Sequence, residues 1–198
     1  MCIRDSYCID TERVADAMTR RTRAIVPVHL YGQVADMRAL TQIADGGVHV
    51  IEDAAQAHGA SRDGVGAGQA STAAAWSFYP GKNLGALGDA GAVTTDDPDV
   101  AATLRALREH GQRAKYDSVM EGYTARLDTI QAIALTAKLA HLEDADVGAV
   151  REGIALEQPL ETLEHLLPDR VVDLRQVEER HGGRGRVWVG DGRETLHE

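Results

Sequence analysis

The sequence is poor in cysteine and contains no long apolar run. Its two cysteines, Cys2 and Cys8, both lie near the start of the 198-residue chain. They cannot build a disulfide framework or a cysteine-based zinc site within this chain. No stretch approaches the roughly 18 apolar residues that span a bilayer, and the first residues lack the apolar core of a secretory signal. We therefore expect a cytoplasmic protein that does not interact with membranes.

Basic charge is also scarce. The chain has 21 Lys and Arg residues against 31 Asp and Glu residues, which gives a formal net charge of −10. Affinity for a nucleic-acid backbone depends on clustered Lys and Arg side chains, so we expect no nucleic-acid partner. The hydrophobic fraction of 43% is enough for one core. A chain of this length corresponds to about one domain.

Helical and extended patterns alternate in the first half of the chain. Asp10 and Asp36 are each expected to cap a helix, because an Asp side chain can accept hydrogen bonds from the free amides of a first turn. The predicted strands are short apolar or β-branched runs at 24–29, 48–51, 73–78 and 91–95. Strand, helix and strand in succession, with short connections, predict an α/β fold whose mostly parallel sheet is flanked by helices.

Two further helices are predicted in the second half. One follows Asp97 and ends at Gly111, and the other covers about 127–142. In the latter, the apolar positions predict packing against another element, as core or interface rather than a ligand site; they are Ile130, Ile133, Ala134, Ala137 and Leu139.

The two ends of the chain fall outside this pattern. Residues 1–6 resemble a translated sequencing adaptor, and we interpret them as a non-native scar. Beyond residue 142 the chain becomes acidic, with a helical pattern at 156–167 and a Gly/Arg/His cluster at 180–186 that we interpret as a solvated loop. We leave 143–198 unassigned, with the hypothesis that a frameshift near 142–150 put this tail out of frame.

One lysine lies in a glycine-rich connection between two predicted strands. Lys82 belongs to the stretch Ser-Phe-Tyr-Pro-Gly-Lys-Asn-Leu at 77–84. A phosphate-binding P-loop is excluded, because Trp76 and Asn83 stand where that motif needs Gly and Ser or Thr. A lysine held against a sheet loses part of its hydration and can act as an amine nucleophile. The alternative is a solvated loop lysine.

Two carboxylates are expected at the end of the strand over 48–51. Glu52 and Asp53 would lie at the carboxyl end of the sheet, where α/β proteins bind ligands. Asp53 could pair with a cationic group of a ligand or cap a helix. A metal hydrolase that uses His49, His58 and the two carboxylates is a weaker alternative, because no paired-His motif supports it.

Taken together, these stretches resemble the DegT/DnrJ/StrS-type sugar aminotransferases, which belong to the aspartate-aminotransferase-like class of pyridoxal-phosphate enzymes. The resemblance covers residues 7–142 and implies part of the large cofactor-binding domain of that class. The matching motifs occur in family order at 27–32, 52–59, 77–84, 88–92, 110–111 and 126–128.

The resemblance also implies roles for individual residues. Lys82 would form the Schiff base with pyridoxal phosphate and then carry a proton between cofactor and substrate. Asp53 would pair with the protonated pyridine nitrogen, which keeps the ring able to accept electrons. Gln56 would bind the ring hydroxyl and Ser77 the phosphate, while the small Ala55 would let the ring approach the backbone.

One position differs from the family pattern, and one family segment would lie before the stretch that resembles it. Thr124 stands where the family usually has Asn, which reaches the phosphate of the neighbouring subunit, and its hydroxyl can still donate. The family's phosphate loop and its ring-stacking aromatic would precede Tyr7. The resemblance gives no specific role to His29 or His58.

The implied reaction is the amination of a nucleotide-linked keto-sugar by a homodimer, with glutamate or glutamine as amino donor. Lys82 favours this reaction over sugar dehydration, because the dehydrating relatives have His at that position. The alternative function is a non-catalytic binding or regulatory protein with the same cofactor fold.

Overall fold

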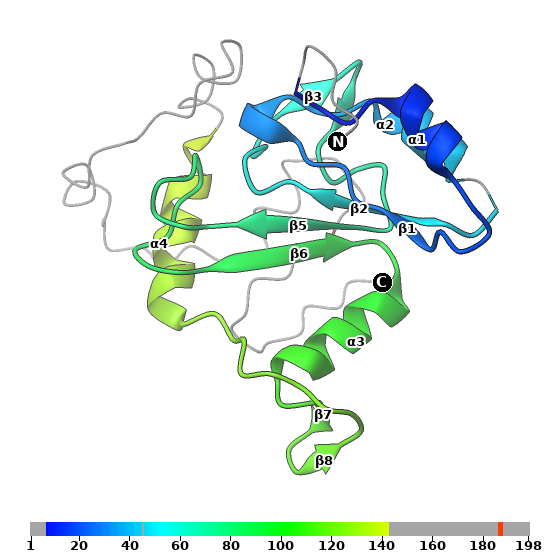
Figure 1. Cartoon of the computed structure of the whole chain (residues 1–198). Coiled ribbons are helices and arrows are strands. Elements are labelled where there is room, and N and C mark those ends of the chain that lie inside the picture. The colour runs from blue at the N-terminus through cyan, green and yellow to red at the C-terminus, as the bar shows by residue number, and fades with distance from the viewer. Residues whose placement is uncertain (1–6, 45, 143–185, 188–198) are drawn as a thin grey trace.

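A five-stranded sheet forms the centre of the chain (Figure 1). The structure is a computed structural model and describes residues 7–44, 46–142 and 186–187. The strands, in sheet order, are β1 (Ala24–Ile25), β2 (His49–Asp53), β5 (Ala73–Ser77), β6 (Gly91–Thr95) and β9 (Arg186–Val187). β1, β2 and β5 run parallel, whereas β6 and β9 are each antiparallel to the strand before them in the sheet. The predicted α/β class is confirmed.

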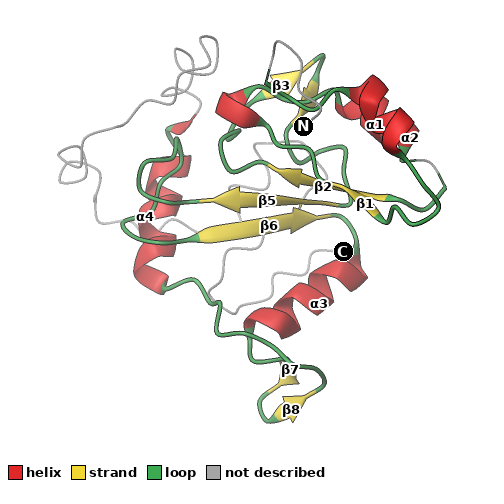
Figure 2. Ribbon diagram, viewed as in Figure 1, coloured by secondary structure: helices red, strands yellow, loops and turns green. Residues whose placement is uncertain are grey.

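The described residues contain four α-helices, which pack around this sheet. They are α1 (Thr11–Ala17), α2 (Met37–Ile43), α3 (Pro98–Arg108) and α4 (Thr129–Leu139), with a short 3₁₀ turn, η1 (Leu30–Gly32), before α2. Figure 2 shows α1 and α2 together, α3 near β6, and α4 beside the connection from β5 to β6. No helix in the described ranges is long and apolar enough to cross a membrane.

The helix starts follow the predicted capping. The carboxylate of Asp10 accepts from the amide of Glu12 at 3.1 Å, and that of Asp36 accepts from Ala39 at 3.0 Å. Before α3, Asp97 accepts from Asp99 in the same way at 2.8 Å. These bonds satisfy amides that have no partner inside a helix.

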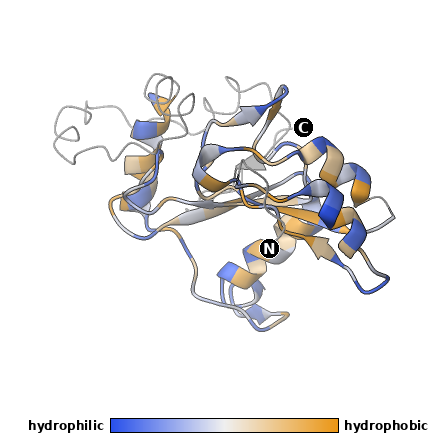
Figure 3. Ribbon diagram, turned by 45° about the horizontal axis from the view of Figure 1, so that its top comes forward, coloured by the Kyte–Doolittle hydropathy of each residue, from blue (hydrophilic) through white to orange (hydrophobic). Residues whose placement is uncertain are grey.

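The main core lies between the sheet and the first two helices. Along β2 the buried side carries Val50 and Glu52, while His49 and Ile51 are exposed. The buried apolar residues of this layer include Val14, Ile25, Leu40, Val50 and Ala74. Figure 3 shows apolar residues along the central strands and mixed polar and apolar residues on the helices.

The strands differ from the prediction in length and number. β1 ends at Ile25, because Pro27 has no amide hydrogen to continue the ladder, and an isolated bridge between Val28 and Asp53 resumes it. Two small hairpins occupy segments for which no strand was predicted: β3 (Ser61–Arg62) with β4 (Val65–Gly66), and β7 (Gln112–Ala114) with β8 (Asp117–Ser118). Strands this short leave no alternation for a sequence pattern to reveal.

Two predictions concern the C-terminal half. The helix predicted at 156–167 lies outside the described residues. Of the predicted loop at 180–186, Arg186 is described and forms part of β9.

The prediction that the apolar residues of this helix pack against another element holds in part. Ala134 is buried and Leu139 packs against the apolar cluster that includes Leu135, whereas Ile130 and Ile133 are 62% and 55% exposed. The buried residues of α4 are Ala132, Ala134 and Leu135. Several apolar residues on one helix leave the choice of buried face open, and the packing partner decides it.

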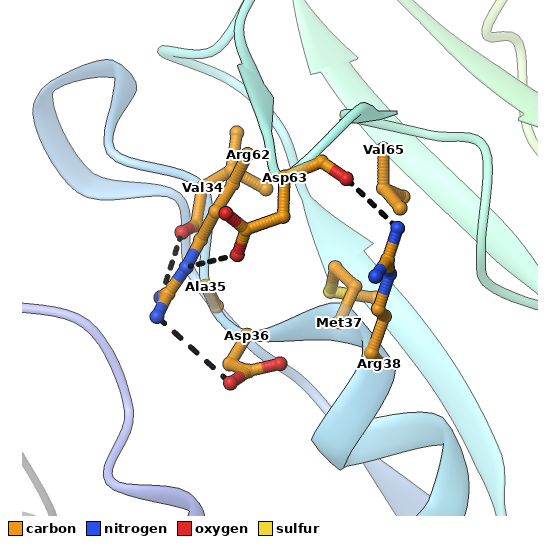
Figure 4. Close-up of a pocket in the computed structure, with 8 residues that line it drawn as sticks. All are labelled: Val34, Ala35, Asp36, Met37, Arg38, Arg62, Asp63 and Val65. Carbon is orange, nitrogen blue, oxygen red and sulfur yellow. Dashed lines mark hydrogen bonds and ion pairs between the residues drawn. The ribbon is translucent and has the colours of Figure 1, made fainter.

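A small pocket between α2 and the first hairpin has a structural role (Figure 4). Its volume of about 10 Å³ is no larger than one water molecule requires. Arg62 lies 3.8 Å from the carboxylate of Asp36 and 3.6 Å from that of Asp63. Arg38 donates to the carbonyl oxygen of Asp63 at 2.8 Å. These partly exposed contacts connect the hairpin to the start of α2.

Candidate functional site

The sheet brings the ends of β2 and β5, with Asp53 and Ser77, to one edge. Asp53, the last residue of β2, is aligned with Ala75 of the neighbouring parallel strand β5. Ser77 ends β5 two residues later, and alternation along a strand places it on the same face as Ala75. Lys82 lies on the connection from β5 to β6. The prediction that Asp53 ends a strand of the sheet is therefore confirmed.

Local backbone contacts hold the carboxylate of Asp53 in place. Its Oδ1 accepts from the amide of Ala55 at 3.1 Å. Its own amide donates to the carbonyl of Pro27 at 2.9 Å, and its carbonyl accepts from the amide of His29 at 3.0 Å. Oδ2 makes no hydrogen bond within the part of the chain that the structure describes. This oxygen is therefore available to an N–H group of a ligand.

The amide of Gln56 has a defined orientation. Its Oε1 accepts from the backbone amide of Tyr31 at 2.9 Å. Tyr31 has a positive φ of 55°, a left-handed conformation that is uncommon for a bulky residue. Because the oxygen is occupied, the Nε2 hydrogens of Gln56 are left to donate to an acceptor such as a ring hydroxyl.

Lys82 is half-buried in a closed turn. Its backbone amide donates to the carbonyl of Tyr79 at 2.9 Å, and the amide of Ala86 donates to the carbonyl of Phe78 at 2.8 Å. Among residues 7–44, 46–142 and 186–187, no hydrogen bond or ion pair engages the Lys82 ammonium group. Within the described part of the chain, the amine is therefore not paired with a carboxylate.

His58 is a buried imidazole near Lys82. Its side chain is 4% exposed and lies between the rings of Trp76 and Phe78, whose centroids are 5.4 and 5.8 Å away. Neither ring nitrogen has a hydrogen-bond partner of good geometry among the described residues. Burial and then the positive charge of Lys82 lower the pKa of His58 to about 4, with the backbone of Ser77 acting to a smaller extent in the opposite direction. His58 is therefore neutral at physiological pH.

Replacing Lys82 with methionine should raise the pKa of His58, because one of the two causes of its lowering is removed. In the wild type an unfolded His takes up a proton near pH 6.5, whereas folded His58 does so near pH 4. Acidification between these values should therefore cost up to about 3 kcal/mol of stability, and less in the variant. NMR titration of the imidazole and denaturation at pH 7 and pH 4.5 measure both effects. Lys115→Met, at an exposed position, is the control, and equal pKa values in both variants would contradict the predicted proximity.

A buried pair, His29 and Glu52, lies directly beside Asp53. The His29 Nε2 atom is 2.6 Å from Oε2 of Glu52, and both side chains are fully buried. The amide of Ala35 donates to Nδ1 of His29 at 3.2 Å. Since Nδ1 accepts, the proton of a neutral His29 is on Nε2 and is donated to Glu52.

Glu52 stays ionised in this position. Burial alone would raise its pKa, but the hydrogen bonds from His29 and from the amide of Gly68, at 2.8 Å, lower it overall. The pair therefore connects three segments next to Asp53. They are the turn before η1, the end of β2 and the glycine-rich connection that follows β2. The sequence pattern alone assigned it no role.

Thr124 is not in contact with the other predicted site residues. Its hydroxyl lies 3.2 Å from Nδ1 of His110, just beyond α3, and it forms an isolated bridge with Glu109. No contact within the described ranges joins Thr124 to Lys82 or Asp53. Its predicted role concerns a neighbouring subunit and stays a prediction.

The described residues do not contain a group of three or more His, Cys, Asp or Glu side chains that could hold a metal ion. Of the four residues considered for a metal hydrolase, Glu52 is directed to His29, and His49 lies 3.4 Å from the hydroxyl of Thr72.

Two contacts from α4 to the Lys82 connection were also not predicted. Gln131 Oε1 accepts from the amide of Leu87 at 2.8 Å, and Lys138 Nζ donates to the carbonyl of Gly85 at 2.8 Å. A Gln and a Lys on a helix are usually solvated, so the pattern gave no reason to select them.

Comparison with known proteins agrees with this arrangement. The profile of the DegT/DnrJ/EryC1/StrS aminotransferase family matches residues 3–179. A dTDP-3-amino-3,4,6-trideoxy-alpha-D-glucose transaminase from Streptomyces venezuelae is 54% identical over 140 residues, 70% of this chain and 37% of that protein. A pleiotropic regulatory protein from Geobacillus stearothermophilus is 45% identical over 177 residues, 89% of this chain and 47% of that protein. The family profile extends past residue 142. The predicted division of the chain into a cofactor-binding part at 7–142 and an unassigned tail at 143–198 stays a prediction.

Solved structures show the same similarity. DesV of S. venezuelae, in complex with a ketimine intermediate, has a TM-score of 0.68 and 53% identity, and the match covers 71% of this chain and 38% of DesV. NtdA of Bacillus subtilis, with bound cofactor PMP, has a TM-score of 0.61 and 34% identity, over 73% of this chain and 32% of NtdA. The chain spans less than half the length of each of these relatives. Because the family profile covers most of its residues, the chain belongs to the DegT/DnrJ/EryC1/StrS aminotransferase family.

Proposed function

We propose that the chain is the lysine-bearing part of a pyridoxal-phosphate-dependent aminotransferase that acts on a nucleotide-linked keto-sugar. The observation that carries this proposal is the amine of Lys82, which has no hydrogen bond or ion pair among the described residues, on the connection that follows β5 and at the sheet edge where Asp53 ends β2. The 54% identity to a dTDP-sugar transaminase over these residues supports it.

The residues at this edge suit the cofactor. Lys82 would hold it covalently through Nζ, and Oδ2 of Asp53, which has no hydrogen bond among the described residues, would accept a hydrogen bond from the protonated ring nitrogen. Gln56 would donate from Nε2 to the ring hydroxyl, since its oxygen is held by Tyr31. The hydroxyl of Ser77 accepts from the amide of Tyr79 at 3.3 Å and keeps its own hydrogen for a phosphate oxygen.

The protein groups have separable tasks in such a reaction. When bound, pyridoxal phosphate supplies a ring that accepts electrons as a proton leaves the neighbouring carbon. Asp53 would keep the ring nitrogen protonated, and the small Ala55 would allow the flat ring to lie against the backbone. Lys82 Nζ, once free, would take that proton and return it to the product carbon. The neutral His58 adds no positive charge beside this amine.

The names of relatives support the substrate class. One relative, from Pseudomonas aeruginosa and 44% identical, is a UDP-2-acetamido-2-deoxy-3-oxo-D-glucuronate aminotransferase. Another, from Streptomyces fradiae and 46% identical over 109 residues, is an L-glutamine:2-deoxy-scyllo-inosose aminotransferase, which supports glutamine as a donor. A cytoplasmic homodimer, with Thr124 reaching the phosphate of the neighbouring subunit, follows from the family resemblance and completes the proposal.

A non-catalytic regulatory function is the second candidate. Two relatives carry regulatory names: the pleiotropic regulatory protein of G. stearothermophilus and the erythromycin biosynthesis sensory transduction protein EryC1 of Saccharopolyspora erythraea, which is 54% identical over 140 residues. Such a protein would bind the cofactor without transferring an amino group.

Adding pyridoxal phosphate should produce a visible absorption band from the lysine-bound cofactor, and Lys82→Ala should abolish it. Lys115→Ala should keep the band, because Lys115 lies on the exposed β7–β8 turn. Subsequent addition of glutamate or glutamine should remove the band if the protein transfers amino groups and leave it unchanged if it is regulatory. A band that persists in Lys82→Ala would refute the proposed site.

A further inference from the structure

The connection that carries Lys82 is tightly closed upon itself. A Cβ atom added to Gly85 would lie 2.3 Å from the carbonyl oxygen of Pro80 and 3.0 Å from that of Tyr79. The two sides of the turn therefore touch through backbone atoms, with Lys82 between them. Backbone contacts close this turn, and the residues that pack against it add to what fixes its position.

Helix α4 provides this packing with one face. Gln131, Leu135 and Lys138 are spaced four and three residues apart, which places them in line on the helix surface. Figure 1 shows α4 beside the connection between β5 and β6. Leu135 is 4% exposed and belongs to a small apolar cluster with Phe78, Leu84 and Ala86.

The two polar residues hold backbone atoms on either side of this cluster. Lys138 Nζ donates to the carbonyl of Gly85, and Gln131 Oε1 accepts from the amide of Leu87, both at 2.8 Å. A Cβ on Gly88 would lie 3.0 Å from Gln131 Nε2, so the helix approaches the turn closely. Burial lowers the pKa of Lys138, in keeping with an ammonium group that has given up part of its hydration.

From these contacts we infer that Gln131 and Lys138 are positioning residues, which fix the Lys82 turn by binding the backbone at Leu87 and Gly85. The proposed function of Lys82 gives this inference its catalytic meaning, but the contacts can be tested without cofactor. Loss of either contact should free the turn. The main core, between the sheet and helices α1 and α2, should stay intact.

Amide hydrogen exchange of the cofactor-free chain tests the contacts. Lys138→Met keeps the length of the side chain and removes the donor, and Gln131→Leu removes the acceptor. Each should speed exchange of the amides of Lys82 and Ala86 on the order of tenfold, with amides of α1 and β2 unchanged. Lys138→Arg and Gln131→Glu retain a donor and an acceptor and should restore slow exchange. Lys115→Met is the matched control.

Absorbance with pyridoxal phosphate then tests the consequence for Lys82. Lys138→Met and Gln131→Leu should need on the order of tenfold more cofactor than the wild type to reach the same band. Unchanged exchange in both variants, or faster exchange throughout the chain, would overturn the inference. A wild type without any band, whose Lys82 turn still loosens in the variants, would support the inference and count against the proposed function alone.

Discussion

Replacing His29 with leucine should lower the free energy of unfolding by about 3–5 kcal/mol. The substitution leaves the carboxylate of Glu52 buried without the 2.6 Å hydrogen bond that stabilises its charge. It also removes the acceptor of the Ala35 amide. Because the pair connects β2 to the turn before η1, we expect loss of cofactor binding as well as loss of stability. Urea denaturation of the cofactor-free chain measures the loss of stability.

A second histidine provides the control. His49 lies on the exposed side of the same strand and has one long contact, to Thr72. His49→Leu should cost less than about 1 kcal/mol. The double variant His29→Leu/Glu52→Leu removes both partners and should regain part of the loss, because an uncompensated buried charge is worse than an apolar pair. If His29→Leu were no more costly than His49→Leu, the pair would not have the structural role given to it here.

Gly85→Ala should disrupt the Lys82 turn and weaken the binding of pyridoxal phosphate at least tenfold. The added methyl group would meet the carbonyl oxygen of Pro80 at 2.3 Å, and backbone atoms on both sides cannot move apart without opening the turn. Overpacking typically costs about 1–3 kcal/mol, which corresponds to about a tenfold or hundredfold effect. Titration of the visible band with cofactor measures this loss.

The same turn contains a matched control. A Cβ on Gly81 would have no atom closer than 3.7 Å, an ordinary contact with the ring of Tyr79. Gly81→Ala should therefore bind cofactor as the wild type does. Equal binding by Gly85→Ala and Gly81→Ala would show that the closed form of the turn is not needed to present Lys82.

The layout of the fold could be predicted because its signals are local. Asp10, Asp36 and Asp97 each precede a helical pattern and each caps a helix in the structure. β5 begins with a continuous apolar run, Ala73–Trp76, and β2 has the β-branched Val50 and Ile51 at its centre. The hairpins at 61–66 and 112–118 could not be predicted in this way, since strands of two or three residues show no periodicity.

The sequence could propose candidate site residues where a single residue has a fixed place in a motif. Lys82 and Asp53 were selected in this way, and their roles stay predictions. The structure shows that β2, which ends at Asp53, lies beside β5, which precedes the Lys82 connection. The buried pair was not predictable, because the proton on His29 is set by the amide of Ala35, which reaches Nδ1 only after the chain turns through η1. A local sequence pattern does not predict such a tertiary contact.

The contacts of α4 were missed for a related reason. A helix with several apolar residues can bury more than one face, and the choice depends on which neighbour packs against it. The sequence pattern favoured burial of Ile130 and Ile133, but both are exposed in the structure. The structure instead uses the face of Leu135, with Gln131 and Lys138 placed to bind the backbone of the Lys82 turn.

Covalent mapping of the cofactor tests the central role of Lys82 most directly. The sequence has lysine only at positions 82, 115 and 138, so three peptides account for every lysine side chain. The protein would be incubated with pyridoxal phosphate, reduced with borohydride, digested and analysed by mass spectrometry. We predict that the label is found predominantly on Lys82, although Lys115 is more exposed. A label shared equally among the three lysines, or concentrated on Lys115, would contradict the assignment of Lys82 as the cofactor-binding residue.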